Sequence, residues 1–285
     1  MSEHITHYAV CDDCLRLMDR MAEMNETFRH VAIEHLDIAR LGSVTRSTDS
    51  FNPALLERIR DGWQARQPQE NLERKLAYSL GTLLHRAADR TMKPVFATLG
   101  ADDPQDPTDV SVYHDVFVFR EVYKGGTALP YAPNMFGAAT PFEEVFRVLF
   151  QRTLLSIHTF IPDRSDPEAW LDRLFKVRQD AYVQIARYAQ AFHNPDPAKY
   201  QAYIVDAMFY DPDDALTRCA RAIQNGEALP DGAVTAAADA AAPTSKYSEA
   251  LHRGVSYLRT ANRYFQRHIS LAEAKKAWSI GTPDL

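Results

Sequence analysis

The feature that most constrains the fold is a long amphipathic stretch from about Gln69 to Met92. Apolar residues recur there every three or four positions, which places them on one stripe of a helix. The members of this stripe are Leu72, Leu76, Leu80, Leu83, Leu84 and Ala87. A helix with a single apolar stripe must bury it against other elements. We expect the helix to stop at Pro94, because proline lacks the N–H that continues a helix.

The same periodicity recurs along most of the chain, whereas strand-like alternation between turn residues is almost absent. Further helices are expected over 4–24, 27–41, 53–64, 142–160, 167–192, 197–209, 213–225 and 246–279. The segment 110–122 is rich in β-branched and aromatic residues, but its apolar positions also fit helical spacing. The sequence therefore predicts an all-α fold, a multi-helix bundle of about eight to ten helices.

The chain has no internal repeat and no strong domain boundary, so we expect one helical domain over 1–285. Residues 1–125 contain the candidate site, and 126–225 and 246–285 supply further helices. The segment 226–245 is rich in Ala, Gly and Pro, with Leu229 as its large apolar residue. That composition predicts a flexible linker or a solvent-exposed excursion. The Gly, Pro and Asp content of 100–108 predicts a loop.

Composition excludes several classes of protein. With 285 residues, of which 46% are hydrophobic and 25% charged, the chain can bury a sizeable core. Three cysteines do not make a disulfide scaffold. No apolar run reaches the roughly 18 residues of a membrane span, and the first residues lack the pattern of a signal peptide. The net charge of −6 argues against a nucleic-acid partner. We expect a cytoplasmic protein without a transmembrane segment, and the oligomeric state stays open.

The sharpest indication of a functional site is the pair His85 and Asp89 in the leucine-striped helix. Side chains at i and i+4 lie on one helical face. Gly81, one turn earlier, leaves space for another backbone or for a ligand. A charged group that points inward needs a partner, and imidazole and carboxylate are ordinary zinc ligands. The pair therefore predicts either a metal site or a hydrogen-bonded His–Asp pair near the core.

Cys11 and Cys14 form a CxxC pattern on the first predicted helix, on the same face as His7. One straight helix cannot supply all of these groups to one metal, because their spread along the axis is too great. Without a second CxxC, small buried thiols are the favoured interpretation of the two cysteines.

His30, Glu34 and Asp37 share a face of the second predicted helix. This face fits either a solvated charged surface or an Asp37 that reaches a metal. His114 lies within an apolar run, where a satisfied core histidine is commoner than a ligand.

The order of these signals resembles the zinc-dependent phospholipase C family, an all-α fold shared with the S1/P1-type nucleases. The resemblance covers roughly residues 1–125, in the segments ITHYAVCDDCLRLM, HLDIARLG, YSLGTLLHRAAD and VYHDVF. Its most specific part is the LGxxxHxxxD pattern. The resemblance implies a cluster of up to three zinc ions between helices and the hydrolysis of phosphate esters. The implied metal ligands are His7, Asp37, His85, Asp89 and His114.

The chain departs from the family's pattern at several ligand positions. The family usually has a further His where residues 36–84 contain none, and a His before a Pro where Lys93 precedes Pro94. Val118 stands where the family usually has a carboxylate, and Leu36 replaces a Pro. The remaining candidates support one or two zinc ions, or a site that has lost its metal. Lys93 is notable because an ammonium can replace a cation electrostatically.

The resemblance implies metal-assisted hydrolysis of a small-molecule or lipid phosphate ester, with histidine ligands. Asp37 or Asp89 would bridge metal and water or act as general base. An alternative is a non-catalytic binding or scaffold protein on the same helical fold, because several ligands are missing. A third interpretation is a di-iron helical oxidase-like protein, prompted by the face of His30, Glu34 and Asp37. The repeated Glu-x2-His pairs of di-iron bundles are absent, however.

Overall fold

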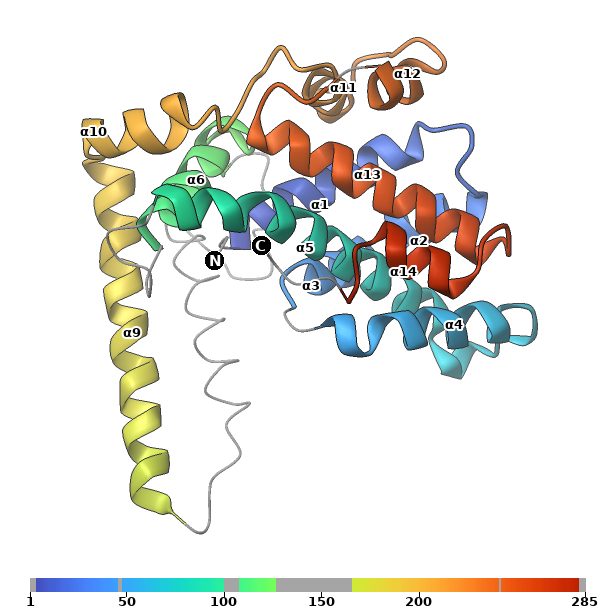
Figure 1. Ribbon diagram of the computed structural model, residues 1–285, viewed down its shortest axis with the longest axis horizontal. Helices are drawn as coiled ribbons and strands as arrows, with labels where there is room; N and C mark the ends of the chain where they lie inside the picture. Colours follow the sequence, from blue (N-terminus) through green and yellow to red (C-terminus); the bar gives the residue numbers. More distant parts are fainter. Residues whose placement is uncertain (1–3, 46–47, 100–107, 127–165, 241, 282–285) are drawn as a thin grey trace.

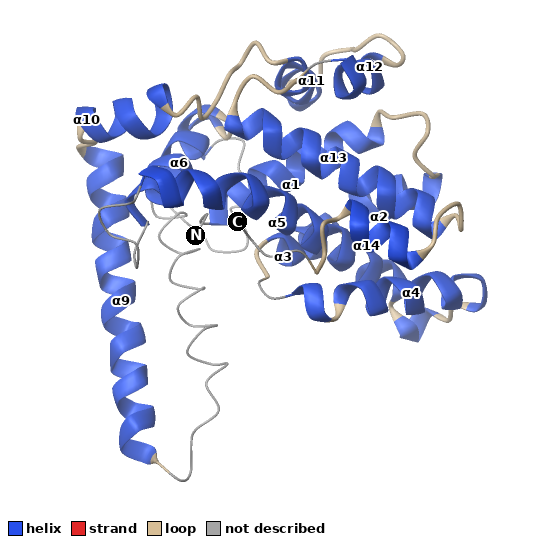
Figure 2. Ribbon diagram, viewed as in Figure 1, coloured by secondary structure: helices blue, strands red, loops and turns tan. Residues whose placement is uncertain are grey.

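The computed structural model describes residues 4–45, 48–99, 108–126, 166–240 and 242–281. Within these ranges the chain forms twelve α-helices and no strand, which confirms the all-α class (Figure 2). No helix in the described ranges combines the length and the apolar character needed to cross a bilayer. The helix expected at 142–160, and all but the last residue of the loop expected at 100–108, lie outside the described residues.

Helix α5 (Leu72–Leu99) is the central element, and α1 (His4–Asp19), α3 (Leu36–Ser43) and α13 (Lys246–Phe265) pack against it (Figure 1). The predicted stripe is buried from Leu76 to Ala87, whereas Leu72 is half-buried. The predicted stop at Pro94 is wrong, because α5 continues to Leu99. Pro94 is exposed, so water can take the place of the missing N–H.

Two glycines allow α3 and α5 to touch backbone to backbone. A Cβ added to Gly81 would collide with the carbonyl of Ala39, and one added to Gly42 would collide with the carbonyl of Tyr78. Of the two uses expected for the space at Gly81, the structure shows the close approach of another backbone. This contact brings the C-terminal end of α3 against the middle of α5.

The helix predicted over 27–41 is two helices, α2 (Glu26–Glu34) and α3. They are separated at His35, whose φ of −124° and ψ of 37° are not helical. Asn25 caps the start of α2 by accepting a hydrogen bond from the N–H of Thr27 at 2.7 Å. The break at His35 sets the faces of α3 independently of those of α2.

The N-terminal helix is shorter than expected, since α1 ends at Asp19. Next along the chain come α4 (Asn52–Gly62) and, after α5, α6 (Thr108–Glu121). The β-rich segment 110–122 is thus almost entirely helical. Helix α9 (Pro167–His193) agrees with its prediction, and α10 (Pro197–Tyr200) leads into a π-helical turn over Gln201–Asp206.

The C-terminal part contains α11 (Ala215–Gln224), α12 (Ala233–Ala240), α13 and α14 (Leu271–Ala277). Helix α12 lies inside the predicted linker 226–245 and buries Val234 and Ala237, so this segment is not a structureless linker. The helix predicted over 246–279 is two helices. The chain turns between them at Arg267, whose φ is 63°.

Candidate metal centre

Three of the five sequence candidates meet between α1 and α5. His7 comes from α1, His85 and Asp89 come from α5, and one ligand atom from each lies within 4.8 Å of the others. Nε2 of His7 is 3.3 Å from Oδ1 of Asp89, and Nε2 of His85 is 3.4 Å from Oδ2. The two imidazole rings stack with centroids 4.3 Å apart and an angle of 17° between their planes. Both rings therefore direct a nitrogen at the same carboxylate.

A backbone carbonyl fixes the orientation of His85. Its Nδ1 lies 2.9 Å from the carbonyl oxygen of Ser43, the last residue of α3. Because a carbonyl only accepts, Nδ1–H is the donor, and Nε2 is the ring nitrogen that faces Asp89. A hydrogen bond of this kind commonly orients a metal-binding histidine. The close packing at Gly42 and Gly81 is what brings Ser43 within reach.

Asp115 of α6 holds the first turn of α1, immediately before His7. Its carboxylate accepts hydrogen bonds from the N–H of Ile5 at 3.1 Å and from the N–H and hydroxyl of Thr6 at 2.8 and 2.6 Å. The hydroxyl of Tyr188 on α9 donates to the same group at 2.9 Å. These bonds satisfy N–H groups that a helix start otherwise leaves unpaired. A buried carboxylate thereby fixes where α1 starts and where His7 lies.

The charge on Asp89 is stabilised by its neighbours. Burial on its own raises the pKa of this carboxyl, but hydrogen bonds from His7 and His85 hold the pKa well below its usual range. Nζ of Lys93, one turn later on α5, lies 3.3 Å from Oδ2 of Asp89. Asp89 is therefore an ionised carboxylate that faces two imidazoles and an ammonium.

The donor set of His7, His85 and Asp89 could hold a metal ion. Tetrahedral zinc, with bonds of about 2.0–2.2 Å, holds its ligand atoms about 3.3–3.6 Å apart. The distances of 3.3 Å from Nε2 of His7 to Oδ1 of Asp89 and of 3.4 Å from Nε2 of His85 to Oδ2 lie in this range, each nitrogen facing a different oxygen of the carboxylate. Neutral imidazole is the form of histidine that binds metal. Side-chain exposure rises from 2% at His7 through 17% at Asp89 to 35% at Lys93, so the cluster opens toward solvent beside Lys93.

Asp37 lies away from this cluster. It is exposed on α3, whose buried face consists of Ala39, Gly42 and Ser43. Residues two apart on a helix point about 200° away from each other, so Asp37 and Ala39 lie on opposite sides. His30 and Glu34 on α2 are exposed as well. Among the described residues, the face proposed for a di-iron site forms no metal-binding group.

His114 is a buried residue of α6 and also lies outside the cluster. Its ring stacks on Phe209, with centroids 3.8 Å apart, and its Nε2 is 3.1 Å from the carbonyl oxygen of Tyr203. Burial lowers the pKa of His114 to about 3, although the contact with the Tyr203 carbonyl partly opposes this shift. The surroundings are those of a neutral core histidine.

The basic residues of α5 differ in their partners. Arg86 is buried, and its Nε donates to the carbonyl of Trp278 at 2.8 Å. Arg90 donates to the carbonyl of Ser279 at 2.9 Å. Both arginines thus anchor the segment after α14. Lys93, by contrast, pairs with the carboxylate of the candidate centre.

Cys11 and Cys14 are fully buried on α1. Burial raises the pKa of both thiols, which disfavours the reactive thiolate. A Cβ on Gly254 of α13 would approach the sulfur of Cys14 to 2.5 Å, so the thiol fills a close helix contact. Both cysteines agree with the interpretation as small buried thiols.

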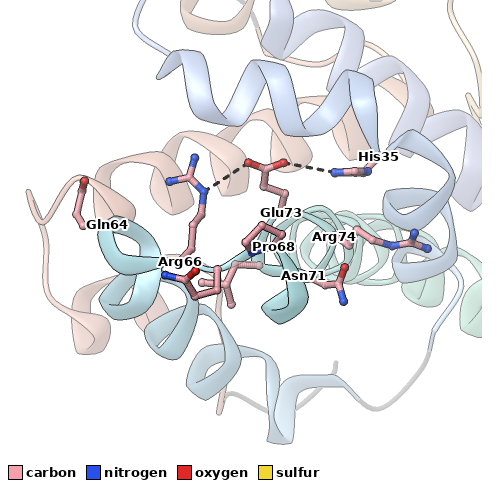
Figure 3. A pocket seen from close by; sticks show the side chains of 9 residues that line it. His35, Gln64, Arg66, Pro68, Asn71, Glu73 and Arg74 are labelled. Atoms are coloured by element: carbon pink, nitrogen blue, oxygen red, sulfur yellow. Dashed lines mark ion pairs between the residues drawn. The ribbon is translucent and has the colours of Figure 1, made fainter.

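A separate polar pocket of about 490 Å³ lies near the start of α5 (Figure 3). Glu73 spans it, with carboxylate oxygens 3.7 Å from His35 and 3.5 Å from Arg66. No motif pointed to this pocket in advance. Glu73 thus already has two partners among the side chains that line the pocket.

Comparison of the chain with known protein families, curated proteins and solved structures gives no match. The geometry of the cluster is therefore the evidence on which function is argued. The relevant facts are two imidazoles and one carboxylate, a carbonyl that orients one imidazole, and an ammonium on the open side.

Proposed function

We propose that this chain binds one zinc ion through His7, His85 and Asp89 and hydrolyses phosphate esters, small-molecule or lipid. The observation that carries the proposal is the convergence of two imidazole nitrogens on one ionised carboxylate, at distances typical of zinc ligands. A zinc ion at this position would supply Lewis acidity toward a phosphoryl oxygen and would acidify water. The neutral rings of His7 and His85 hold the ion, and Ser43 keeps His85 aligned.

The proposal extends to the fold, which we take to be a divergent form of the phospholipase C-like helical fold. The order of the sequence motifs supports this relationship. The site differs in its number of metals, since Asp37 and His114 lie elsewhere and three ligands suffice for one ion with an open position. One oxygen of Asp89 can serve as a ligand while the other accepts a proton from water.

The test starts with zinc binding by the full chain, measured by competition with a chromogenic chelator. We expect one zinc per chain and a loss of affinity of about 100-fold in His85→Ala. His35→Ala is the matched control, because His35 is a histidine outside the cluster. Hydrolysis of a chromogenic phosphodiester should require zinc and should be lost in His85→Ala. A wild-type protein that binds no zinc would overturn the proposal.

The ion pair of Lys93 and Asp89 favours a second candidate function, a non-catalytic binding or scaffold protein. In that case the ammonium balances the carboxylate permanently, and the two histidines only complete a buried polar cluster. This alternative predicts a folded protein with no zinc affinity, and no loss of stability on treatment with a chelator. The metal-binding proposal predicts that a chelator lowers the melting temperature of the zinc-loaded protein.

A further inference from the structure

Lys93 occupies a specific place in the candidate centre. Its ammonium shares Oδ2 of Asp89 with His85, while Oδ1 faces His7. Lys93 is also more exposed than the other members of the cluster, at 35% of its side chain. The ammonium of Lys93 therefore lies on the most exposed side of the cluster.

The charges of the cluster change sign when a divalent metal binds. Without metal, the charges of the Asp89 carboxylate and the Lys93 ammonium cancel. With a divalent ion on the carboxylate, the same groups carry a net charge of about +2, and the metal and the ammonium repel each other. A site with this charge and an open coordination position attracts an anion.

We propose that Lys93 is the second cation of the centre: it pairs with Asp89 before metal binds and binds a phosphoryl oxygen of the substrate once zinc takes Asp89. This inference rests on the proposed zinc site. A lysine suits both positions because its ammonium is a compact charge with three donors on a flexible four-carbon stem. The neighbouring arginines are held by backbone carbonyls, Arg86 by Trp278 and Arg90 by Ser279. Lys93 instead pairs with a proposed metal ligand, so metal binding at Asp89 would change this ion pair.

The proposal predicts opposite effects of one substitution on two affinities. Lys93→Met keeps an unbranched side chain and removes the charge. Zinc should bind about threefold tighter to Lys93→Met, because no ammonium competes for Asp89. Inorganic phosphate should bind the cobalt-loaded variant at least about tenfold more weakly than the cobalt-loaded wild type, because a charge-assisted hydrogen bond is lost. The visible absorption of cobalt reports the phosphate titration.

Two matched variants control the experiment. Lys75→Met removes an exposed lysine from the same helix and should leave both affinities unchanged. Lys93→Arg keeps the charge and should restore most of the phosphate affinity. Vesicles of phosphatidylcholine with added phosphatidic acid form a second arm, which separates a lipid phosphate from a soluble one. The proposal is supported if binding of either inorganic phosphate or the acidic vesicles depends on the positive charge at position 93.

The outcomes distinguish this inference from the function on which it rests. If wild-type protein binds no zinc or cobalt, the proposed zinc site itself fails. If wild type binds metal but Lys93→Met leaves both affinities unchanged, or weakens both together, the role of Lys93 is overturned while the zinc site stands. The same holds if the metal-loaded wild type binds neither inorganic phosphate nor the acidic vesicles. Tighter zinc together with weaker phosphate is the result expected from the charge balance.

Discussion

Helix α1 contributes to two buried polar clusters that differ in how their charges are satisfied. In the first, which we name the aspartate–arginine network, the completely buried carboxylates of Asp12 and Asp13 accept hydrogen bonds from guanidinium and tyrosine hydroxyl groups. The guanidinium of Arg40 donates two hydrogen bonds to the carboxylate of Asp12, at 2.7 and 3.2 Å. The donors of the network are Arg16, Arg40, Tyr123, Arg221 and Tyr247.

The second cluster is the candidate metal centre of His7, His85 and Asp89, about one and a half turns away along α1. Its acceptor is a single carboxylate, and two of the groups around it are imidazoles, which bind a cation when neutral. In the aspartate–arginine network, guanidinium and tyrosine donors already occupy the carboxylate oxygens and balance their charge, so these oxygens are not available as metal ligands. The comparison teaches that a buried carboxylate surrounded by guanidinium and hydroxyl donors is a structural feature, whereas a carboxylate that faces two imidazoles is a candidate metal site.

The largest effect is expected from breaking the aspartate–arginine network. The side chain of Asp12 has no exposed surface, and Arg40→Leu removes the guanidinium that donates two hydrogen bonds to it. We expect the free energy of unfolding to fall by about 3–5 kcal/mol, the cost of an uncompensated buried charge. Urea titration measures it. Arg20→Leu, which removes an arginine with 61% exposure, should change stability by less than about 0.5 kcal/mol. Equal losses in both variants would contradict the distinction.

The next largest effect tests the contact between α3 and α5 that supports the metal centre. Gly81→Ala drives a methyl group into the carbonyl of Ala39 and should cost about 3 kcal/mol in unfolding free energy. Zinc affinity should fall as well, because Ser43 moves away from His85. Gly62→Ala is the control: its methyl group meets a side-chain carbon of Leu72 at 3.4 Å, an ordinary contact. A Gly81→Ala protein with unchanged zinc affinity would show that the Ser43 contact is dispensable.

A smaller effect is expected at Asp115. Asp115→Ala removes the acceptor for the N–H groups of Ile5 and Thr6 and should lower the free energy of unfolding by about 2 kcal/mol. Because the first turn of α1 carries His7, zinc affinity should fall in the folded variant too. Asp109→Ala on the same helix removes a partly exposed partner of Lys199 and serves as the control. If Asp115→Ala lowers stability but leaves zinc affinity unchanged, Asp115 caps α1 without positioning His7 for metal binding.

The smallest effect comes from a helix cap whose side chain belongs to neither cluster. Asp214 accepts hydrogen bonds from Leu216 and Thr217 at the start of α11. Burial raises its pKa, but these bonds and those from Thr244 lower the pKa below the ordinary value overall. The stabilisation is therefore present above the pKa of the unfolded chain, about 3.9, and is lost as pH falls through the folded value.

Asp214→Ala should cost about 1 kcal/mol at pH 7, and the difference from wild type should shrink toward pH 3. Urea titrations at several pH values measure it. A difference that stays constant over this range would mean that the charge on Asp214 does not contribute.

Sequence reasoning was most reliable where a pattern lies within one helix. The i, i+4 spacing of His85 and Asp89 correctly put both side chains on one face, and Gly81 correctly indicated a close contact. His7 entered as a candidate ligand through the resemblance, and the crossing of α1 over α5 brings it to Asp89. Nothing in its local sequence distinguishes it from a histidine on an ordinary amphipathic helix.

Positions that depend on breaks between helices could not be predicted. The turn at His35 decides that Asp37 faces solvent, and no glycine or proline marks that turn. Pro94 predicted a break that does not occur, because α5 is exposed at this position and continues to Leu99. For His114, the apolar surroundings in the sequence already favoured a core role, and Phe209 and Tyr203 supply the contacts.

The most direct test of the zinc site is a crystal structure of the full chain with zinc, located by anomalous scattering at the zinc absorption edge. We predict one strong peak between α1 and α5, about 2.0–2.2 Å from Nε2 of His7, Nε2 of His85 and a carboxylate oxygen of Asp89. The ammonium of Lys93 should have moved away from Asp89. Crystals that show no zinc at this position, with Lys93 still paired to Asp89, would contradict the proposal.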